Sequence, residues 1–397
     1  MSSSHPAARP LRVLHTIPGR NWGGMEQRVL EQVRWLLGHG HTAWVAAAPD
    51  SETYRRAVAL GLPAVAMTFD RPWRPSVVAA LRRFVRDNRV DVVDTHVTRD
   101  AKAALTCLDL CTVVRSRHVD QPLKTSLPRR LQWRLGADHV VTVAGTIRRP
   151  LIQQGLAEAD RSTWVGGWAE DRFFDHPDPA AARARVRAEF GLGPEAIVLL
   201  CVAMLRVDKG QNHLLRAVRL LVDRGLPVVC LLAGAATAES ADYTAGLHAQ
   251  AAAAGIADRV HFLGYRDDVP DLMQAADLKV ISSLVEGQPR VSVQTFASGR
   301  PLVATDVGGV AEIVIDGTTG WIAPPADPEA LAATIARALA DPAKMKEVAA
   351  NARRVADQTM RIDIRMAQAL EVYGVAMARA RGRRFPRWRG TGGGSEL

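Results

Sequence analysis

Residues 282–305 read SSLVEGQPRVSVQTFASGRPLVAT, a loop followed by a short helix and then a strand. The apolar run Leu278–Ile281 leads into the loop, Pro289 suits an early helical position, and Gly299 closes the helix. Amides at the start of such a helix favour a phosphate or sugar oxygen beyond the strand ends. Glu286 is hard to explain as core, because a buried carboxylate needs partners, which ligand hydroxyls would supply. The stretch therefore predicts a ligand site at the carboxyl end of a strand.

The same alternation of strand and helix continues in both directions along the chain. Short apolar runs separated by longer amphipathic stretches are typical of βαβ units and parallel sheets. The predicted strands fall into two series, at 11–17, 42–48, 64–67, 90–95, 113–117 and 139–143, and at 197–203, 227–233, 260–263, 278–281 and 302–304. The predicted fold class is therefore α/β, with two Rossmann-like doubly wound domains facing across a cleft.

The boundary between the two series lies in residues 165–179, where two glycines and two prolines interrupt the rhythm. We predict a first domain at 1–170 and a second at 171–378, closed by helices at 328–340 and 343–378 with a break near Gln358. The remaining residues, 379–397, are rich in Arg and Gly and are predicted to be a disordered basic tail.

Composition indicates a globular protein large enough for two cores, with 397 residues of which 48% are apolar. The four cysteines form no CxxC pair, which is typical of reduced core residues. The start of the chain lacks the apolar core of a signal peptide, and the longest apolar run is about half of what a membrane span needs. We therefore expect a cytoplasmic location.

The net charge of +10 is unevenly distributed. Residues 1–170 hold 24 Lys and Arg against 15 Asp and Glu, and residues 379–397 hold six Arg against one Glu. Basic ends fit either nucleic-acid binding or an enzyme resting on an anionic leaflet, and charge alone leaves both open. Two basic stretches, 71–74 around Trp73 and 115–134, form either a seat on the inner face of the cytoplasmic membrane or an ordinary solvated surface.

Two features of the first half follow predicted strands. After the first strand, residues 19–26 read GRNWGGME, in which glycines let backbone amides approach a ligand at the start of a helix. The G-x-G-x-x-G spacing of dinucleotide sites is missing. His96 directly follows the strand at 90–95, where open α/β sheets place their ligand crevice. No second zinc ligand stands near His96 at ligand spacing in the sequence, so we expect no metal there.

Arg206 and Lys209 stand in the sequence AMLRVDKGQNHLL, residues 203–215, where a strand gives way to a helix. Two cations at such a turn suit the two charges of a diphosphate without a metal. A solvated turn is the alternative, and a second site across the same cleft favours the functional interpretation.

Taken together, these motifs resemble the retaining glycosyltransferases of family 4. The resemblance covers nearly the whole chain and rests on EGQP at 286–289, DKG at 208–210, DVGGVAEIV at 306–314, DGTTGW at 316–321, GGME at 23–26, DVVDTH at 91–96, SRHV at 116–119 and ADHVVTV at 137–143. It implies a GT-B fold, in which the second domain holds most of a nucleotide-sugar donor and the first holds most of the acceptor. We interpret Glu312, within the third of these motifs, as scaffold.

Family resemblance also implies individual roles. His96 would sit near the transferred sugar, Glu286 would meet its hydroxyls, and Lys209 with Arg206 would neutralise the diphosphate. The amides from Gly287 onward would face the donor phosphate. The predicted catalytic residues are His96, Glu286, Lys209 and Arg206; the predicted donor-binding residues are Gly23, Gly24, Gly264, Tyr265, Gly287, Gln288, Pro289, Arg290 and Gln294.

One departure from the family pattern concerns Gln294, which stands where the family has a second Glu that binds the ribose hydroxyls. A neutral amide still forms a hydrogen bond there but lacks charge assistance of about 1–2 kcal/mol. No paired D-x-D aspartates flank a strand end, so we predict metal-independent catalysis with no cofactor.

The predicted function is a retaining transfer of sugar from a UDP- or GDP-sugar to a hydroxyl of a glycan or lipid-linked acceptor. The expected setting is cell-envelope polysaccharide or lipopolysaccharide biosynthesis, with an anionic membrane surface as a further candidate partner and no nucleic acid. Three alternatives remain: a nucleotide-sugar epimerase or hydrolase of the same fold, a basic nucleic-acid-binding protein, and a catalytically silent scaffold.

Overall fold

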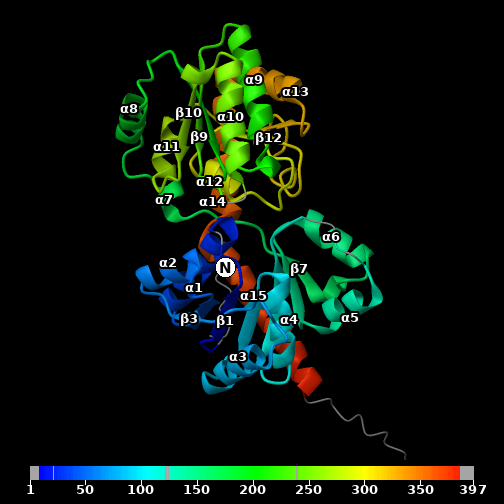
Figure 1. The fold of residues 1–397 in the computed structure, drawn as a ribbon. Coiled ribbons are helices and arrows are strands. Elements are labelled where there is room, and N and C mark those ends of the chain that lie inside the picture. Colours follow the sequence, from blue (N-terminus) through cyan, green and yellow to red (C-terminus); the bar gives the residue numbers. More distant parts are fainter. Residues whose placement is uncertain (1–8, 21, 121–122, 124, 238–239, 385–397) are drawn as a thin grey trace, which may run out of the picture.

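Two parallel sheets organise the chain in the computed structural model, which describes residues 9–20, 22–120, 123, 125–237 and 240–384. Figure 1 shows the domain built on the second sheet above the domain built on the first. The predicted α/β class with two Rossmann-like domains is confirmed.

The first sheet has seven strands within the described residues, in the order β3-β2-β1-β4-β5-β6-β7. In chain order their bounds are β1 (Arg12–Ile17), β2 (Thr42–Ala47), β3 (Ala64–Ala66), β4 (Val92–Thr95), β5 (Thr112–Arg117), β6 (His139–Thr142) and β7 (Ser162–Trp164). The helices between them are α1 (Gly24–Gly38), α2 (Glu52–Ala59), α3 (Pro75–Asp87), α4 (Thr98–Ala104), α5 (Leu127–Leu135) and α6 (Gly145–Gln153).

The second sheet has six strands in the described part of the chain, in the order β10-β9-β8-β11-β12-β13. Their bounds are β8 (Ile197–Val202), β9 (Val228–Ala233), β10 (Val260–Gly264), β11 (Leu278–Ile281), β12 (Leu302–Thr305) and β13 (Trp321–Ala323). The associated helices are α7 (Asp171–Phe174), α8 (Pro179–Glu189), α9 (Gln211–Asp223), α10 (Ala241–Ala253), α11 (Val269–Ala275), α12 (Arg290–Ala297), α13 (Pro328–Leu339) and α14 (Pro342–Thr359).

Both sheets reverse their strand order at one point, between β1 and β4 in the first and between β8 and β11 in the second. At such a switch point the connections on either side leave to opposite faces, so a crevice opens beyond the carboxyl ends of the strands. The loops that follow these four strands carry Gly23, His96, Lys209 and Glu286. The topology therefore gathers the predicted site residues at two facing crevices.

Most of helix α15 (Ile362–Arg384) lies in the range predicted for the second domain, but the helix packs on the first domain. Its apolar side chains, among them Met366, Val372 and Tyr373, pack in the core of the first domain with β1 and α1. Figure 1 shows it running through the first domain after α14. Residues 379–384, which we had expected in a disordered tail, continue this helix, because Ala376 and Ala380 are buried. The rest of that tail, 385–397, lies outside the described residues.

Among the described helices, none combines the length and the apolar character that crossing a membrane requires.

Candidate functional site

Lys209 and Glu286, predicted from two separate loops, meet in the second domain. Lys209 Nζ donates a hydrogen bond of 2.7 Å to Glu286 Oε1. Lys209 follows β8 and Glu286 follows β11, and these strands are neighbours, so their carboxyl ends open onto the same crevice. Both side chains remain accessible to a ligand, with 17% and 12% of their surface exposed. The two residues therefore lie side by side at the carboxyl end of the second sheet.

The two loops are fixed to each other by backbone contacts. Gly210 has φ +62°, and an added Cβ there would collide with the Ser282 carbonyl oxygen, so this turn requires glycine. Ser282 Oγ donates to the Lys209 carbonyl oxygen at 3.0 Å, and Ser283 Oγ donates to Glu286 Oε1 at 2.7 Å. The Lys209–Glu286 pair is thereby held in place before any ligand arrives.

Arg206 lies on the same turn but points into solvent. Its side chain is 42% exposed, and its Nε pairs with Asp208 at 2.9 Å. An exposed pair of this kind contributes little to stability, about 0–1 kcal/mol, so an incoming anion can replace Asp208 at small cost.

Three histidines, of which His15 and His96 are buried and His118 is partly buried, form a chain toward the carboxyl ends of strands in the first sheet. His15 Nδ1 lies 3.0 Å from His96 Nε2, and His96 Nδ1 lies 2.9 Å from His118 Nε2, each at hydrogen-bonding distance. His15 belongs to β1, while His96 and His118 directly follow β4 and β5, which lie side by side in the sheet. The sheet thus brings together residues that stand far apart in the sequence.

Burial keeps all three rings neutral. It lowers the pKa of His15 and His118 to about 3 and that of His96 well below its ordinary value. A neutral imidazole has one donor and one acceptor nitrogen. The cluster therefore places no positive charge at this end of the sheet.

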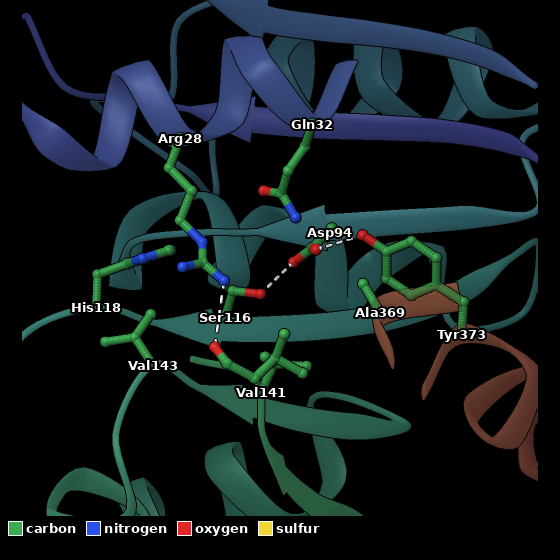
Figure 2. Close-up of a pocket in the computed structure, with 10 residues that line it drawn as sticks. Arg28, Gln32, Asp94, Ser116, His118, Val141, Val143, Ala369 and Tyr373 are labelled. Atoms are coloured by element: carbon green, nitrogen blue, oxygen red, sulfur yellow. Dashed lines mark hydrogen bonds between the residues drawn. The ribbon is translucent and has the colours of Figure 1, made fainter. Parts of the chain in front are cut away.

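Asp94 lies beside this chain, at the base of a small pocket between the sheet, α1 and α15 (Figure 2). Its two oxygens accept hydrogen bonds from Ser116 Oγ at 2.8 Å and from Tyr373 OH at 2.7 Å. Burial raises the pKa of Asp94 to about 7. Arg28 and Gln32 reach the pocket from α1, as Figure 2 shows.

His15, Asp94 and His96 are also the group of described residues whose geometry could hold a metal ion, since their ligand atoms lie within 4.8 Å of one another. Our expectation that His96 has no neighbouring ligand was wrong, because the strand pairing places His15 opposite Asp94. Both nitrogens of His96 and both oxygens of Asp94 already form hydrogen bonds within the protein. We therefore interpret the group as a hydrogen-bonded network.

The two crevices face each other at close range. Gly23 faces Met204, whose Cε would lie 3.5 Å from an added Cβ, and Gly24 faces Arg290. A Cβ on Gly287 would collide with the His118 carbonyl oxygen. The loop that carries Glu286 therefore lies directly against the loop that follows β5, so the loops that carry the two sets of predicted residues meet between the domains.

Several predicted donor-binding side chains instead contact the first domain or the segment between the domains. Arg290 pairs with Glu31 at 2.6 Å and with Glu170 at 3.4 Å. Gln294 Nε2 donates to Glu170 at 3.4 Å, and Gln288 Oε1 accepts a hydrogen bond from the Gly167 amide. Pro289 is the residue just before α12. These side chains therefore join the second domain to the first and to the segment between them.

Gly264 and Tyr265 lie at the end of β10, and Tyr265 is 44% exposed. Arg56 of the first domain donates a hydrogen bond of 3.3 Å to Tyr265 OH. Its guanidinium lies 4.6 Å from the Trp22 ring and 5.2 Å from the Tyr265 ring. These contacts bridge the domains at one end of the cleft.

Glu312, interpreted from sequence as scaffold, bridges them elsewhere. Its carboxylate accepts hydrogen bonds from the amides of Gly145 at 2.9 Å and Thr146 at 2.5 Å, at the start of α6 in the first domain. A carboxylate at a helix N-terminus is electrostatically favoured.

Both halves of the chain match models of known families. Residues 22–167 match the model described as Glycosyltransferase Family 4, and residues 182–355 match the model described as Glycosyl transferases group 1. The chain belongs to the family 4 type of GT-B glycosyltransferases.

Curated relatives of this family 4 chain align over only part of their length. The alpha-D-kanosaminyltransferase of Streptomyces kanamyceticus is 30% identical over 54% of each chain. The lipopolysaccharide core biosynthesis mannosyltransferase LpcC of Rhizobium leguminosarum bv. viciae is 34% identical over 55% of this chain and 63% of its own length. The chain thus spans between about half and two thirds of these relatives.

Solved structures extend the likeness to the whole fold. A glycosyltransferase from Rickettsia africae has a TM-score of 0.83 at 17% identity and covers 93% of this chain and 99% of its own. HepE from Anabaena, in complex with UDP and glucose, has a TM-score of 0.77 at 22% identity and covers 92% and 99%. At these identities the likeness concerns the GT-B fold alone.

Sequence reasoning about this glycosyltransferase missed His15, His118 and Tyr373. His118 stands in a motif that we quoted and directly follows a predicted strand, so the rule that selected His96 could have selected it as well. His15 lies inside a strand, and its proximity to His96 depends on the strand order. Tyr373 reaches Asp94 only because α15 returns to the first domain.

Proposed function

We propose that this glycosyltransferase moves a sugar from a nucleoside-diphosphate sugar to a hydroxyl of a glycan or lipid-linked acceptor, with retention of anomeric configuration. The observation that carries the proposal is the Lys209–Glu286 pair at 2.7 Å, in which Glu286 stands on a loop that lies against His118 of the histidine chain. A cation for the diphosphate and a carboxylate for sugar hydroxyls stand side by side, facing neutral hydrogen-bonding groups.

The donor's diphosphate would lie between the turn after β8 and the start of α12. Lys209 would exchange its contact with Glu286 for a phosphate oxygen, and Arg206 would exchange Asp208 for another. Glu286 would then be free to accept hydrogen bonds from the sugar. Gly264 and Tyr265 would lie beside the base, and Gly23 and Gly24 would let the diphosphate approach the first domain.

Bond cleavage leaves a nucleoside diphosphate whose negative charge must be stabilised. Fixed cations in a cleft stabilise that charge more in the transition state than in the bound donor. The acceptor hydroxyl loses its proton to the departing phosphate oxygen. His96, neutral because it is buried, would sit near the sugar and hold the His118 ring in place through the hydrogen bond between them.

Relatives support a nucleotide-sugar donor and an envelope setting. HepE was solved with UDP-glucose, and one curated relative is named for lipopolysaccharide core biosynthesis. We therefore propose a UDP- or GDP-sugar as donor and a cell-envelope glycan or its lipid-linked precursor as acceptor. Because residues 1–170 are strongly basic, we also propose an anionic membrane surface as a partner.

Donor binding is tested by thermal unfolding with UDP-, GDP- and ADP-sugars. A ligand that binds the folded state at one hundred times its Kd stabilises it by about 2.7 kcal/mol, and we expect one nucleotide class to raise the melting temperature by several degrees. NMR of the product should show the anomeric configuration of the donor. A protein that binds the donor and releases only free sugar or an epimer would instead be a hydrolase or epimerase.

A further inference from the structure

Helix α5 presents a stripe of leucines to solvent. Leu127, Leu131 and Leu135 are 70%, 49% and 64% exposed. Residues four apart are neighbours on one face of a helix, so the three side chains form one continuous strip. Trp133, on the opposite face, is 3% exposed and packs in the domain core. The helix therefore buries one apolar face and leaves a second one in water.

Positive charge lies along one side of this leucine stripe. Arg130 and Arg134 are exposed, and at about 100° per residue they project some 60–100° from the middle of the stripe. Arg134 pairs with Glu158, although half of its own side chain remains exposed. The helix contains no Asp or Glu. A short helix with an exposed apolar strip and adjacent arginines is the pattern of a segment that lies in a membrane interface.

We propose that the outer face of α5 docks on an anionic lipid bilayer, with the three leucines inserted among the headgroups and Arg130 and Arg134 against lipid phosphates. A second protein copy is a poorer occupant. The strip runs for only about 12 Å along the helix, whereas a stable protein interface buries about 800 Å² on each side. Two copies would also bring arginines of the same charge together.

The structure separates this face from the broader basic stretches identified in the sequence. Arg115 does not belong to the surface, because it is 5% exposed, with its guanidinium 3.5 Å from the Trp133 ring. Trp73 is 54% exposed beside the exposed residues Arg71 and Arg74, but it precedes α3 as a single apolar side chain. The docking surface is therefore assigned to α5.

Docking through α5 would bring the cleft close to the bilayer. Strand β5 ends at Arg117, immediately before His118 of the histidine chain, and α5 is the helix that returns from this edge. In Figure 1, α5 lies at the outer edge of the first domain. The start of α5 thus lies toward the cleft, and a lipid-linked acceptor could enter without leaving its leaflet. This consequence rests on the proposed function, whereas the docking itself does not.

Vesicle flotation tests the docking with the full chain. Vesicles of phosphatidylcholine containing phosphatidylglycerol should carry the protein, and vesicles of phosphatidylcholine alone should carry much less. We expect the triple variant Leu127→Ser, Leu131→Ser and Leu135→Ser to reduce partitioning at least tenfold. Arg130→Gln with Arg134→Gln should reduce it by about fivefold per charge. Leu60→Ser is the matched control, since Leu60 is 57% exposed at the end of α2, and it should float like the native chain.

Two outcomes would overturn the proposal. One is native flotation by the leucine triple variant with unchanged circular dichroism. The other is a dimer in light scattering that the triple variant converts to monomer, which would assign the strip to a second copy. Donor binding in thermal unfolding needs no membrane, so a protein that binds donor but does not float contradicts the docking and the membrane partner, and leaves the sugar-transfer proposal standing. A protein that floats but binds no donor contradicts only the proposed function.

Discussion

The carboxyl ends of the two sheets carry side chains of different charge. At the edge of the first sheet stand His15, His96 and His118, which burial keeps neutral. At the edge of the second stand Lys209 and Glu286, which form an ion pair. Under the proposed function, the second domain would neutralise the charges of a donor, and the first domain would supply uncharged hydrogen bonds near the sugar and its acceptor.

The largest effect should come from removing the charges of the second domain. Lys209→Ala takes away a cation facing the leaving diphosphate, and we expect kcat to fall about 10²–10³-fold, the usual loss for one group of this kind. Glu286→Ala should fall by a similar factor through lost sugar contacts. Steady-state rates with the donor found by thermal unfolding measure both.

Lys344→Ala is the matched control for Lys209→Ala, because Lys344 also forms an ion pair, with Glu347 at 2.8 Å, but on α14 away from the cleft. It should leave kcat unchanged. Near-native turnover by Lys209→Ala and Glu286→Ala, both folded, would remove the assigned roles and the contrast between the domains.

A smaller effect on activity should come from replacing one of the neutral histidines of the first domain. His96→Ala removes the ring that holds His118 beside the sugar. The loss of one hydrogen bond to the sugar is worth about 1 kcal/mol, so kcat/KM should fall roughly fivefold. It also leaves His15 and His118 without partners, which should lower the free energy of unfolding by about 1–3 kcal/mol.

Because all three pKa values are lowered by burial, these histidines stay neutral from pH 5.5 to 8 and should add no step to the pH–rate profile there. If the native enzyme shows a step near pH 6.5 that is absent in His96→Ala, then His96 titrates as an exposed imidazole does. The conclusion that the three histidines are neutral would then be wrong.

The elements were predictable from sequence where the local signals were strong. Strand β11 spans Leu278–Ile281 as predicted and β12 begins at Leu302 as predicted, because short apolar runs between turn residues define buried strands. Strands β7 and β13 were missed, since each has three residues and no repeating pattern to detect. The return of α15 to the first domain depends on packing between distant segments.

The candidate site was also predictable from the sequence only in part. Lys209 and Glu286 follow neighbouring strands in a regular α/β order, so their meeting followed from topology. The partners of Arg290 and Gln294 did not, because Glu31 and Glu170 approach them only when the domains close on each other. The local sequence shows which side chains a loop carries. Which residues those side chains contact depends on the packing of the whole chain.

Lys279, a second lysine of the second domain, differs from Lys209 because it is buried and has no proposed contact with a ligand. Lys279 lies in β11, fully buried, and donates hydrogen bonds to the carbonyl oxygens of Leu200 at 3.0 Å and Val280 at 3.2 Å. Burial lowers its pKa from 10.5 to about 8.

Below pH 8 the folded protein holds a charge that the interior disfavours, and the unfolded chain keeps its proton up to about pH 10.5, so stability should rise with pH between these values. Lys279→Met should therefore add about 2–3 kcal/mol at pH 7, with the gain shrinking toward pH 10. Urea unfolding at pH 7 and pH 9.5 measures this, with the exposed Lys346→Met as control. A loss of stability at both pH values would mean that the two carbonyl hydrogen bonds outweigh the cost of burying the charge.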